Sequence, residues 1–154
     1  MLLDLVLFLT LAFYAFTVSQ PLFYWIALTA ASRNLSAPAY IEMRNCIDNQ
    51  MRKRGPAVYY GTLAASVVLA VLVFMQGGTV LRIASFVALL ALVTDIALMM
   101  KGNIPINGVI QNWTPANYPP DWQTYRDRWL SVFGYRQIAL CIGFFGLLAG
   151  AVFK

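Results

Sequence analysis

Four long apolar runs dominate the pattern of hydrophobic and polar positions along the chain. They cover residues 5–31, 57–75, 83–100 and 137–153. A helix that crosses the hydrocarbon core of a bilayer needs about 20 apolar residues, and lipid requires a helix because it offers the backbone no hydrogen bonds. Barrel strands would alternate in polarity, which these runs do not. The pattern predicts an all-α fold, an integral membrane four-helix bundle with residues 1–154 as one domain.

The first run lies near the amino terminus, where a secretory signal would also lie. Such a signal has a basic front and an apolar core of about 7–15 residues. Here the front carries Asp4 and neither Lys nor Arg, and the apolar run is longer. We therefore expect residues 5–31 to be a span of the mature protein.

Three connections of unequal length join the apolar runs. Residues 76–80 contain two glycines and predict a tight turn, so that the second and third spans form a hairpin. The other two connections, residues 32–56 and 101–135, are long and polar. An even number of spans places both long connections on one side of the membrane and both termini on the other.

The two long connections are predicted to carry interfacial amphipathic helices. In the first, Ser36 and Pro38 are typical of a helix start, and the pattern over residues 37–54 indicates a helix in the headgroup plane. Its apolar face holds Tyr40, Met43, Ile47 and Met51. This helix is either a lipid anchor or a docking face or lid. In the second connection we expect an interfacial cap over residues 101–135.

Composition excludes several classes of protein and of site. Hydrophobic residues make up 60% and charged residues 11% of the chain, whereas soluble domains carry about 25% charged residues. A soluble enzyme, a disordered tail and a nucleic-acid-binding domain therefore fit poorly. The chain has no histidine, which rules out histidine-ligated haem, histidine-based zinc sites and Ser–His–Asp triads. Cys46 and Cys141 lie in different zones, and we expect no disulfide, no metal and no cofactor.

The basic residues are distributed unevenly about the predicted spans. Nine of the 11 lie in or beside the two long connections, and only Arg82 and Lys154 lie on the other side. The positive-inside rule then places both long connections in the cytoplasm and both termini outside. We expect a bacterial inner membrane as the location.

Asp95 is the single charged residue within the third run. It lies about 7–8 Å inside the end of the span, and a carboxylate at that depth usually faces the bundle with a partner. We expect an ion pair with Arg136, with Arg126 as the second choice. The pair would serve either as a clamp between two spans or as part of a proton or ligand site.

Other polar residues are expected at a similar depth. Gln20 interrupts the first span beside Pro21, and Asn103 and Asn107 flank Pro105, which predicts the end of the third helix. The asparagines either cap freed backbone groups or form the wall of a pocket. The candidate polar pocket combines Gln20, Asp95, Asn103, Asn107, Trp129 and Arg136.

A stripe of aromatic and basic residues follows Pro119 and Pro120. Its members, at steps of four and three, are Trp122, Arg126, Trp129, Phe133 and Arg136. The stripe predicts a helix that begins near Asp121 and runs into the fourth span. Trp122 and Arg126 are expected to stack by cation–π attraction at the interface, and an aromatic belt with snorkelling arginines is the alternative.

Small residues in the last span indicate close helix packing. Gly146 and Gly150 form a small-xxx-small pair, which suits packing inside the bundle or, as the alternative, between two copies.

These features together resemble the anthrone-oxygenase-like family of small four-span membrane proteins. The matching residues are the Asn103-x-Pro105-x-Asn107 turn and Trp129 followed seven positions later by Arg136. The resemblance implies a four-helix bundle and, for some fungal members, oxygenation of a polycyclic anthrone to a quinone without metal or flavin. It also implies that Asn103, Asn107, Trp129 and Arg136 form the site. The chain departs from the family at Phe133, where a polar His or Asn often stands, and the chain has no histidine, so the usual base for proton abstraction is missing. Asp95 is the alternative base.

Two functions follow from these observations. The first is a non-catalytic membrane bundle, which is either an accessory subunit of a membrane complex or a binder of an apolar ligand such as a lipid or a quinone. The alternative is a cofactor-free oxygenase that acts on an anthrone-like aromatic substrate. Membrane lipid is the expected partner, other membrane subunits or a second copy stay open as partners, and nucleic acid is not expected.

Overall fold

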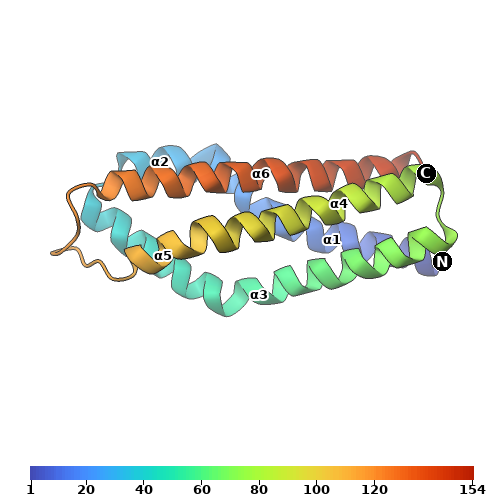
Figure 1. Cartoon of the computed structure of the whole chain (residues 1–154), viewed down its shortest axis with the longest axis horizontal. Helices are drawn as coiled ribbons and strands as arrows, with labels where there is room; N and C mark the ends of the chain where they lie inside the picture. Colours follow the sequence, from blue (N-terminus) through green and yellow to red (C-terminus); the bar gives the residue numbers. More distant parts are fainter.

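The apolar runs are parts of four longer helical segments, Leu2–Asn34, Ala37–Gln76, Thr79–Ile110 and Trp122–Val152. The computed structural model describes all residues from 1 to 154 and shows these segments lying side by side, with both termini at one end (Figure 1). The loop of residues 111–121 lies at the opposite end. All four segments are long and apolar enough to cross a membrane, so the predicted all-α four-helix bundle is confirmed.

Two of the four segments are interrupted by π-helical turns. The first segment consists of α1 (Leu2–Phe23), η1 (Tyr24–Leu28) and α2 (Thr29–Asn34), and the third consists of α4 (Thr79–Leu98), η2 (Met99–Asn103) and α5 (Ile104–Ile110). Helix α3 (Ala37–Gln76) and helix α6 (Trp122–Val152) contain no such turn. Gly77 and Gly78 separate α3 from α4, which confirms the predicted tight turn.

Pro105 does not end the third helix, contrary to the prediction. It is the second residue of α5, one position after Ile104, and helical structure continues to Ile110. Within η2 the backbone hydrogen bonds have already changed from the i→i−4 to the i→i−5 pattern, because the Ile104 N–H donates to the carbonyl of Met99. A proline in this position therefore removes a donor where the regular i→i−4 pattern is interrupted anyway.

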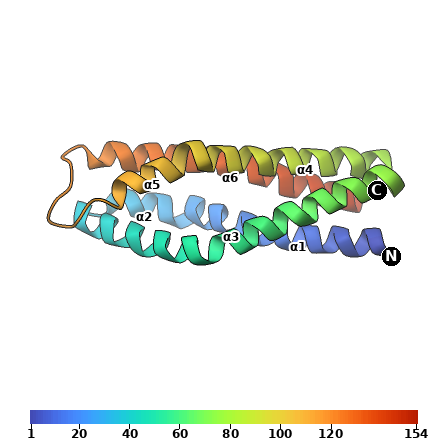
Figure 2. The ribbon, with the colours of Figure 1, turned by 60° about the horizontal axis from the view of Figure 1, so that its bottom comes forward.

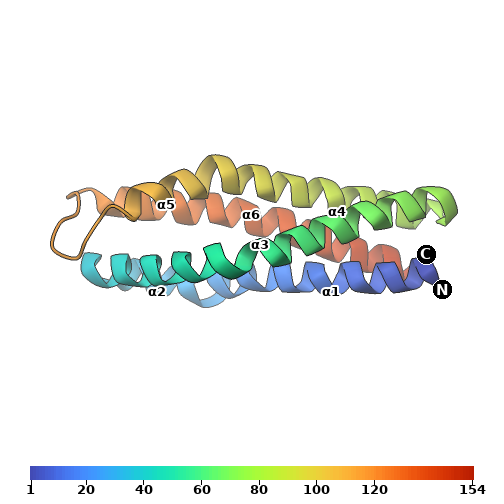
Figure 3. The same cartoon turned by 90° about the horizontal axis from the view of Figure 1, so that it is seen from below.

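The segments predicted to lie in the headgroup plane are extensions of the spans. Residues 37–54 form the first half of α3, and residues 101–110 and 122–135 belong to η2, α5 and α6. The physical reason is visible in α3, where the polar side chains of Arg44 and Asp48 are buried and face the bundle. A helix that buries its polar stripe must stand against other helices, and α3 accordingly runs obliquely along the whole bundle (Figures 2 and 3).

The interior has two clusters of different character. The cluster toward the termini is aliphatic, and its fully buried members include Leu69, Leu92, Leu140 and Leu147. The cluster toward the 111–121 loop is aromatic, and its members include Tyr24, Tyr40, Trp122, Trp129 and Phe133. The predicted stripe of α6 therefore faces inward rather than forming an aromatic belt. Trp122 and Arg126 stack as expected, with the guanidinium carbon of Arg126 5.0 Å from the centre of the Trp122 ring. Both side chains are buried in the bundle, however, and not exposed at an interface.

Large apolar side chains cover the outer surface of the end that holds the termini. Among the exposed ones are Phe8, Phe16, Phe74, Phe86 and Phe145. A surface of this kind suits contact with membrane lipid. Helix α3, at about 1.5 Å per residue, is about twice as long as a bilayer core requires, so its first half extends past the apolar part.

Glycines of α6 bring this helix close to α4. A Cβ atom built on Gly150 would lie 2.3 Å from the Cβ of Ala84, whereas one on Gly146 would meet only Val87 at 3.8 Å. The packing of Gly150 inside the bundle agrees with the first of the two predicted uses of these glycines.

We predict that Gly150→Ala destabilises the bundle by about 1–3 kcal/mol, because the added methyl group must push α4 and α6 apart. The measurement is the melting temperature of the purified protein in detergent. Gly146→Ala is the matched control, and its melting temperature should equal or exceed that of the wild type since alanine favours a helix. Equal melting temperatures for the two variants would contradict the assigned packing.

Candidate functional site

A cavity of about 550 Å³ lies between α3 and the other helices, where the apolar and polar parts of the bundle meet. All four helical segments contribute to its wall, and half of its 18 lining residues are hydrophobic. The lining residues are Gln20, Tyr24, Arg44, Ile47, Asp48, Met51, Arg52, Gly55, Pro56, Tyr59, Tyr60, Met99, Asn103, Ile104, Asn107, Trp129, Phe133 and Arg136. Its volume falls in the range of about 300–1,000 Å³ typical of small-molecule sites.

Arg136 forms one polar wall of the cavity. Its Nε donates to Asp95 Oδ1 at 2.7 Å, which confirms the predicted ion pair. Its Nη1 donates to Asn103 Oδ1 at 3.1 Å, and its Nη2 donates to the hydroxyl of Tyr59 at 2.8 Å. Asp95 is fully buried behind Arg136 and does not line the cavity. The carboxylate therefore fixes the guanidinium from behind, and only one N–H group of Arg136, on Nη1, has no partner within the chain.

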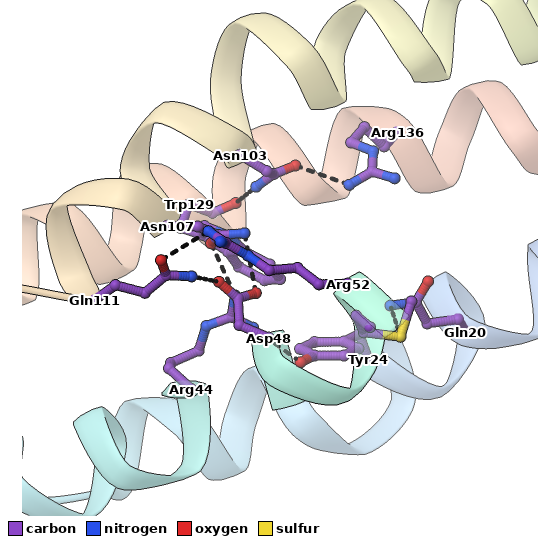
Figure 4. A network of polar contacts seen from close by, with 11 residues as sticks. Gln20, Tyr24, Arg44, Asp48, Arg52, Asn103, Asn107, Gln111, Trp129 and Arg136 are labelled. Carbon is purple, nitrogen blue, oxygen red and sulfur yellow. Dashed lines mark hydrogen bonds and ion pairs between the residues drawn. The ribbon is translucent and has the colours of Figure 1, made fainter. Parts of the chain in front are cut away.

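Asp48 forms the centre of a second polar wall (Figure 4). Its Oδ1 accepts from Arg44 Nη2 at 3.1 Å and from Asn107 Nδ2 at 3.0 Å. Its Oδ2 accepts from Gln111 Nε2 at 2.9 Å. Three donors thus converge on one carboxylate, which holds it as an acceptor in a fixed orientation.

Arg44 links this wall to the aromatic side of the cavity. Its Nη1 donates to the Tyr24 hydroxyl at 3.2 Å, and its Nη2 donates to Asn107 Oδ1 at 2.8 Å. The guanidinium carbon lies 4.1 Å from the centre of the Trp129 ring, a cation–π distance. Since Arg44 is only 3% exposed, its charge depends on these partners for solvation.

Three aromatic rings stand beside the two arginines. The rings of Trp129 and Phe133 are stacked with centroids 4.7 Å apart and planes 14° from parallel. Tyr24 lies 4.7 Å from Phe133, measured between ring centroids. The indole N–H of Trp129 donates to Asn107 Oδ1 at 2.7 Å, so the ring orientation is fixed by the polar network. Arg136 also lies 5.1 Å from the centre of the Phe133 ring.

Both π-helical turns deliver side chains to this cavity. Tyr24 is the first residue of η1, and Met99 and Asn103 are the first and last residues of η2. Single π-helical turns inside α-helices are frequent at functional sites. The cavity is therefore flanked by the two places where the regular helical backbone is interrupted.

The structure brings together five of the six residues of the predicted pocket. Gln20, Asn103, Asn107, Trp129 and Arg136 all line the cavity, whereas Asp95 supports it from behind. Arg126, the second choice as the partner of Asp95, is wrong for that role. It pairs with Asp127 at 3.0 Å, near the far end of α6.

Arg44 and Asp48, the central pair of the second wall, were not predicted as site residues. Both lie off the apolar face of residues 37–54, and charged residues in such a position on an amphipathic helix usually face water. The available signal was the spacing of Tyr40, Arg44 and Asp48 at steps of four, which puts an aromatic ring and an ion pair on one face. Tyr24, Tyr59 and Gln111 were missed as partners of these charges.

Exposed side chains of α3 mark the mouth of the cavity. They are Arg52, Pro56 and Tyr60, again at steps of four, and Ile104 lies on α5. Arg52 Nη2 donates to Gln111 Oε1 at 2.7 Å and so bridges α3 and the end of α5. Two arginines of the lining are balanced by Asp48 and Asp95, and Arg52 adds one positive charge at the mouth.

We predict that Asp95→Asn and Arg136→Gln each destabilise the bundle by about 3–5 kcal/mol, because each leaves a buried charge without its partner. The double variant should recover part of the loss, which a double-mutant cycle on thermal unfolding in detergent measures. Lys154→Gln is the control, since it removes an exposed pair with Asp4 and should leave the melting temperature nearly unchanged. Additive losses from Asp95→Asn and Arg136→Gln would contradict the coupling.

Comparison with known proteins gives no match to this chain among family models, curated proteins or solved structures. The function proposed below therefore rests on the residues of the cavity and on their geometry.

Proposed function

We propose that the protein binds a lipid-soluble aromatic compound with oxygen substituents, of the quinone class, in the cavity between α3 and the other helices. The observation that carries the proposal is the convergence of two buried arginines and a stacked pair of aromatic rings on one cavity of about 550 Å³. A cavity of this kind favours a ligand binder over a purely structural accessory subunit.

The chemistry of the walls fits a flat ring system with carbonyl or hydroxyl groups. Tyr24, Trp129 and Phe133 offer faces and edges for aromatic contacts. Arg44 Nε has no partner within the chain, and Nη1 of Arg44 and Nη1 of Arg136 each donate only one of their two N–H groups to the protein. A quinone or phenol oxygen accepts donors of this kind. Asp48 Oδ2 accepts from Gln111 alone and so has one acceptor position left for a hydroxyl group. Rings and donors are both held in place by hydrogen bonds between helices, so little ordering is left for the ligand to induce.

The position of the cavity supports entry of the ligand from the bilayer. Tyr60 and Ile104 are exposed at its mouth, and Tyr60 lies at the start of the second apolar run. A hydrophobic compound dissolved in lipid would meet this edge of the bundle before the polar walls. Its oxygen atoms would then face the arginines, while the ring system would contact the aromatic side.

A second candidate function is oxygenation of an anthrone-like substrate. The observation that favours it is that Asn103, Asn107, Trp129 and Arg136, the residues implied by the family resemblance, all line one cavity. In that reaction the CH₂ group of an anthrone and one O₂ give a C=O group and water, and a base must first remove a proton. Asp48 is the only carboxylate in the lining, and its oxygens already accept from three donors. Binding without turnover is therefore the better supported of the two.

The test uses the purified protein in lipid nanodiscs with 1,8-dihydroxyanthraquinone, whose binding quenches tryptophan fluorescence. We predict that Gly55→Leu weakens binding at least tenfold, because the added side chain projects into the cavity beside the flexible end of Met51. Gly134→Leu is the matched control, since Gly134 lies on another face of α6 and lines a different hollow. Equal affinities of Gly55→Leu and Gly134→Leu for the anthraquinone would contradict the proposed site.

The same samples separate the two candidate functions. Oxygen uptake is measured with 1,8-dihydroxyanthrone and compared with the spontaneous rate in empty nanodiscs. Uptake above that rate, lost in Gly55→Leu, would assign the oxygenase function to the cavity. Binding of the anthraquinone without added uptake supports a binding protein.

We also propose that the protein lies in a bacterial inner membrane with its termini outside and the 111–121 loop in the cytoplasm. The excess of basic residues toward that loop supports this orientation.

Cys46 is exposed in the first half of α3 and Cys141 is half-buried in α6. We predict that an impermeant maleimide labels Cys46 of a Cys141→Ala variant only after cells are permeabilised. Labelling of intact cells would reverse the orientation.

A further inference from the structure

A second hollow of about 520 Å³ lies on another face of α6, between this helix and the η1–α2 part of the first segment. It shares no lining residue with the cavity described above. The lining residues are Trp25, Thr29, Leu130, Ser131, Gly134, Tyr135, Gln137, Ile138, Cys141 and Ile142. We call this hollow the α6 groove.

The α6 groove has exposed apolar side chains along its wall and unfilled space above Gly134. Trp25 is 66% exposed, and Ile138 and Ile142 are more than half exposed, so large apolar surfaces remain uncovered. A Cβ atom built on Gly134 would meet nothing within 4 Å, which shows that the space above this glycine is unfilled by protein. Within the lining Gln137 donates to the carbonyl of Pro21, and this contact joins α6 to the first segment. An extended hydrocarbon chain suits a hollow of this shape and polarity.

Two arginines lie about one helical turn beyond lining residues of the α6 groove, at the end toward the 111–121 loop. Arg33 follows Thr29 by four positions on α2, and Arg128 precedes Ser131 by three on α6, so each continues a lining stripe of its helix. The carbonyl of Arg33 accepts from Arg126 Nη1 at 3.2 Å, which places the two helix ends at the same height. Both Arg33 and Arg128 are exposed, and neither takes part in any ion pair of the chain.

We propose that the α6 groove binds one anionic phospholipid, with an acyl chain along Trp25 and Ile138 and the phosphate between Arg33 and Arg128. Apolar surface at one end and unpaired positive charge at the other match the two parts of such a lipid. The spacing of the apolar wall and the charged end also agrees with a phospholipid. Arg33 lies eight residues beyond Trp25, which is about 12 Å along a helix that rises 1.5 Å per residue. The proposed orientation puts this end in the leaflet that carries the negative surface potential.

A second copy of the chain is a poorer occupant of the α6 groove. Two copies in one membrane share their orientation, and a two-fold interface brings the same patch of each together. Such an interface would place Arg33 and Arg128 of both copies at one height, with four positive charges close together. Like charges in this arrangement repel each other, whereas a phosphate neutralises them.

The experiment measures lipid retention by native mass spectrometry. Delipidated protein in detergent is titrated with phosphatidylglycerol or with phosphatidylcholine of the same acyl chains. We expect one phosphatidylglycerol to bind at least tenfold more tightly than phosphatidylcholine. The double variant Arg33→Gln/Arg128→Gln should lose this preference, and Gly134→Leu should weaken binding of both lipids because it fills the groove.

Matched controls separate the groove from general effects of charge and hydrophobicity. Lys53→Gln/Arg54→Gln removes two exposed charges from α3, and Gly108→Leu adds the same side chain at another open glycine. Both controls should retain the preference for phosphatidylglycerol. Glycerol phosphate, which lacks acyl chains, should not displace the lipid.

The proposal is overturned if Arg33→Gln/Arg128→Gln keeps the preference for phosphatidylglycerol over phosphatidylcholine. It is also overturned if the control variant Lys53→Gln/Arg54→Gln loses this preference to the same extent. Dimers that appear without lipid and vanish in Gly134→Leu would assign the groove to a second copy instead. A second readout uses brominated phosphatidylglycerol, which should quench the fluorescence of exposed Trp25 and have a smaller effect in Trp25→Phe. Binding of the anthraquinone in the other cavity is unaffected by these variants, so failure here leaves the proposed function standing.

Discussion

Burial of two guanidinium groups is the constraint on which this bundle depends. A charged side chain inside a protein must find partners that replace water, and here the partners come from different helices. Arg136 on α6 is bonded to Asp95 of α4, Asn103 of η2 and Tyr59 of α3. Arg44 on α3 is bonded to Tyr24 of η1 and Asn107 of α5. The two arginines thereby fix the relative heights of all four segments.

The same constraint keeps a space open between the helices. Apolar side chains could slide and fill a gap, but hydrogen-bonded groups stay where their partners hold them. The acceptors of Arg136 approach from several directions, and the Asp48 network does the same on the opposite wall. What remains between them is lined by rings and donors in fixed positions. Selectivity for a ligand would then come from a site formed before the ligand arrives.

The sequence predicted the parts of the fold that depend on apolar length and on isolated charges. Four long apolar helices, the Gly77–Gly78 turn and the Asp95–Arg136 pair were all predictable. The pair was predictable because a lone carboxylate in an apolar run has few possible partners. The Arg44–Asp48 wall was not accessible in the same way. Amphipathic pattern alone assumes that polar faces meet water, and here the polar face of α3 meets other polar groups. The continuation of helix past Pro105 was also hidden, since it depends on the backbone of η2.

The π-helical turns have a consequence for how these helices present their faces. Each turn accommodates one residue more than an α-helical turn, which rotates everything beyond it by about 100° relative to an uninterrupted helix. A helical wheel drawn through residues 2–34 or 79–110 therefore loses phase part of the way along. Side chains such as Asn107 owe their inward direction to that offset. The cavity therefore depends on the number of residues in η1 and η2, as well as on the side chains that line it, because one residue more or fewer would turn other side chains toward it.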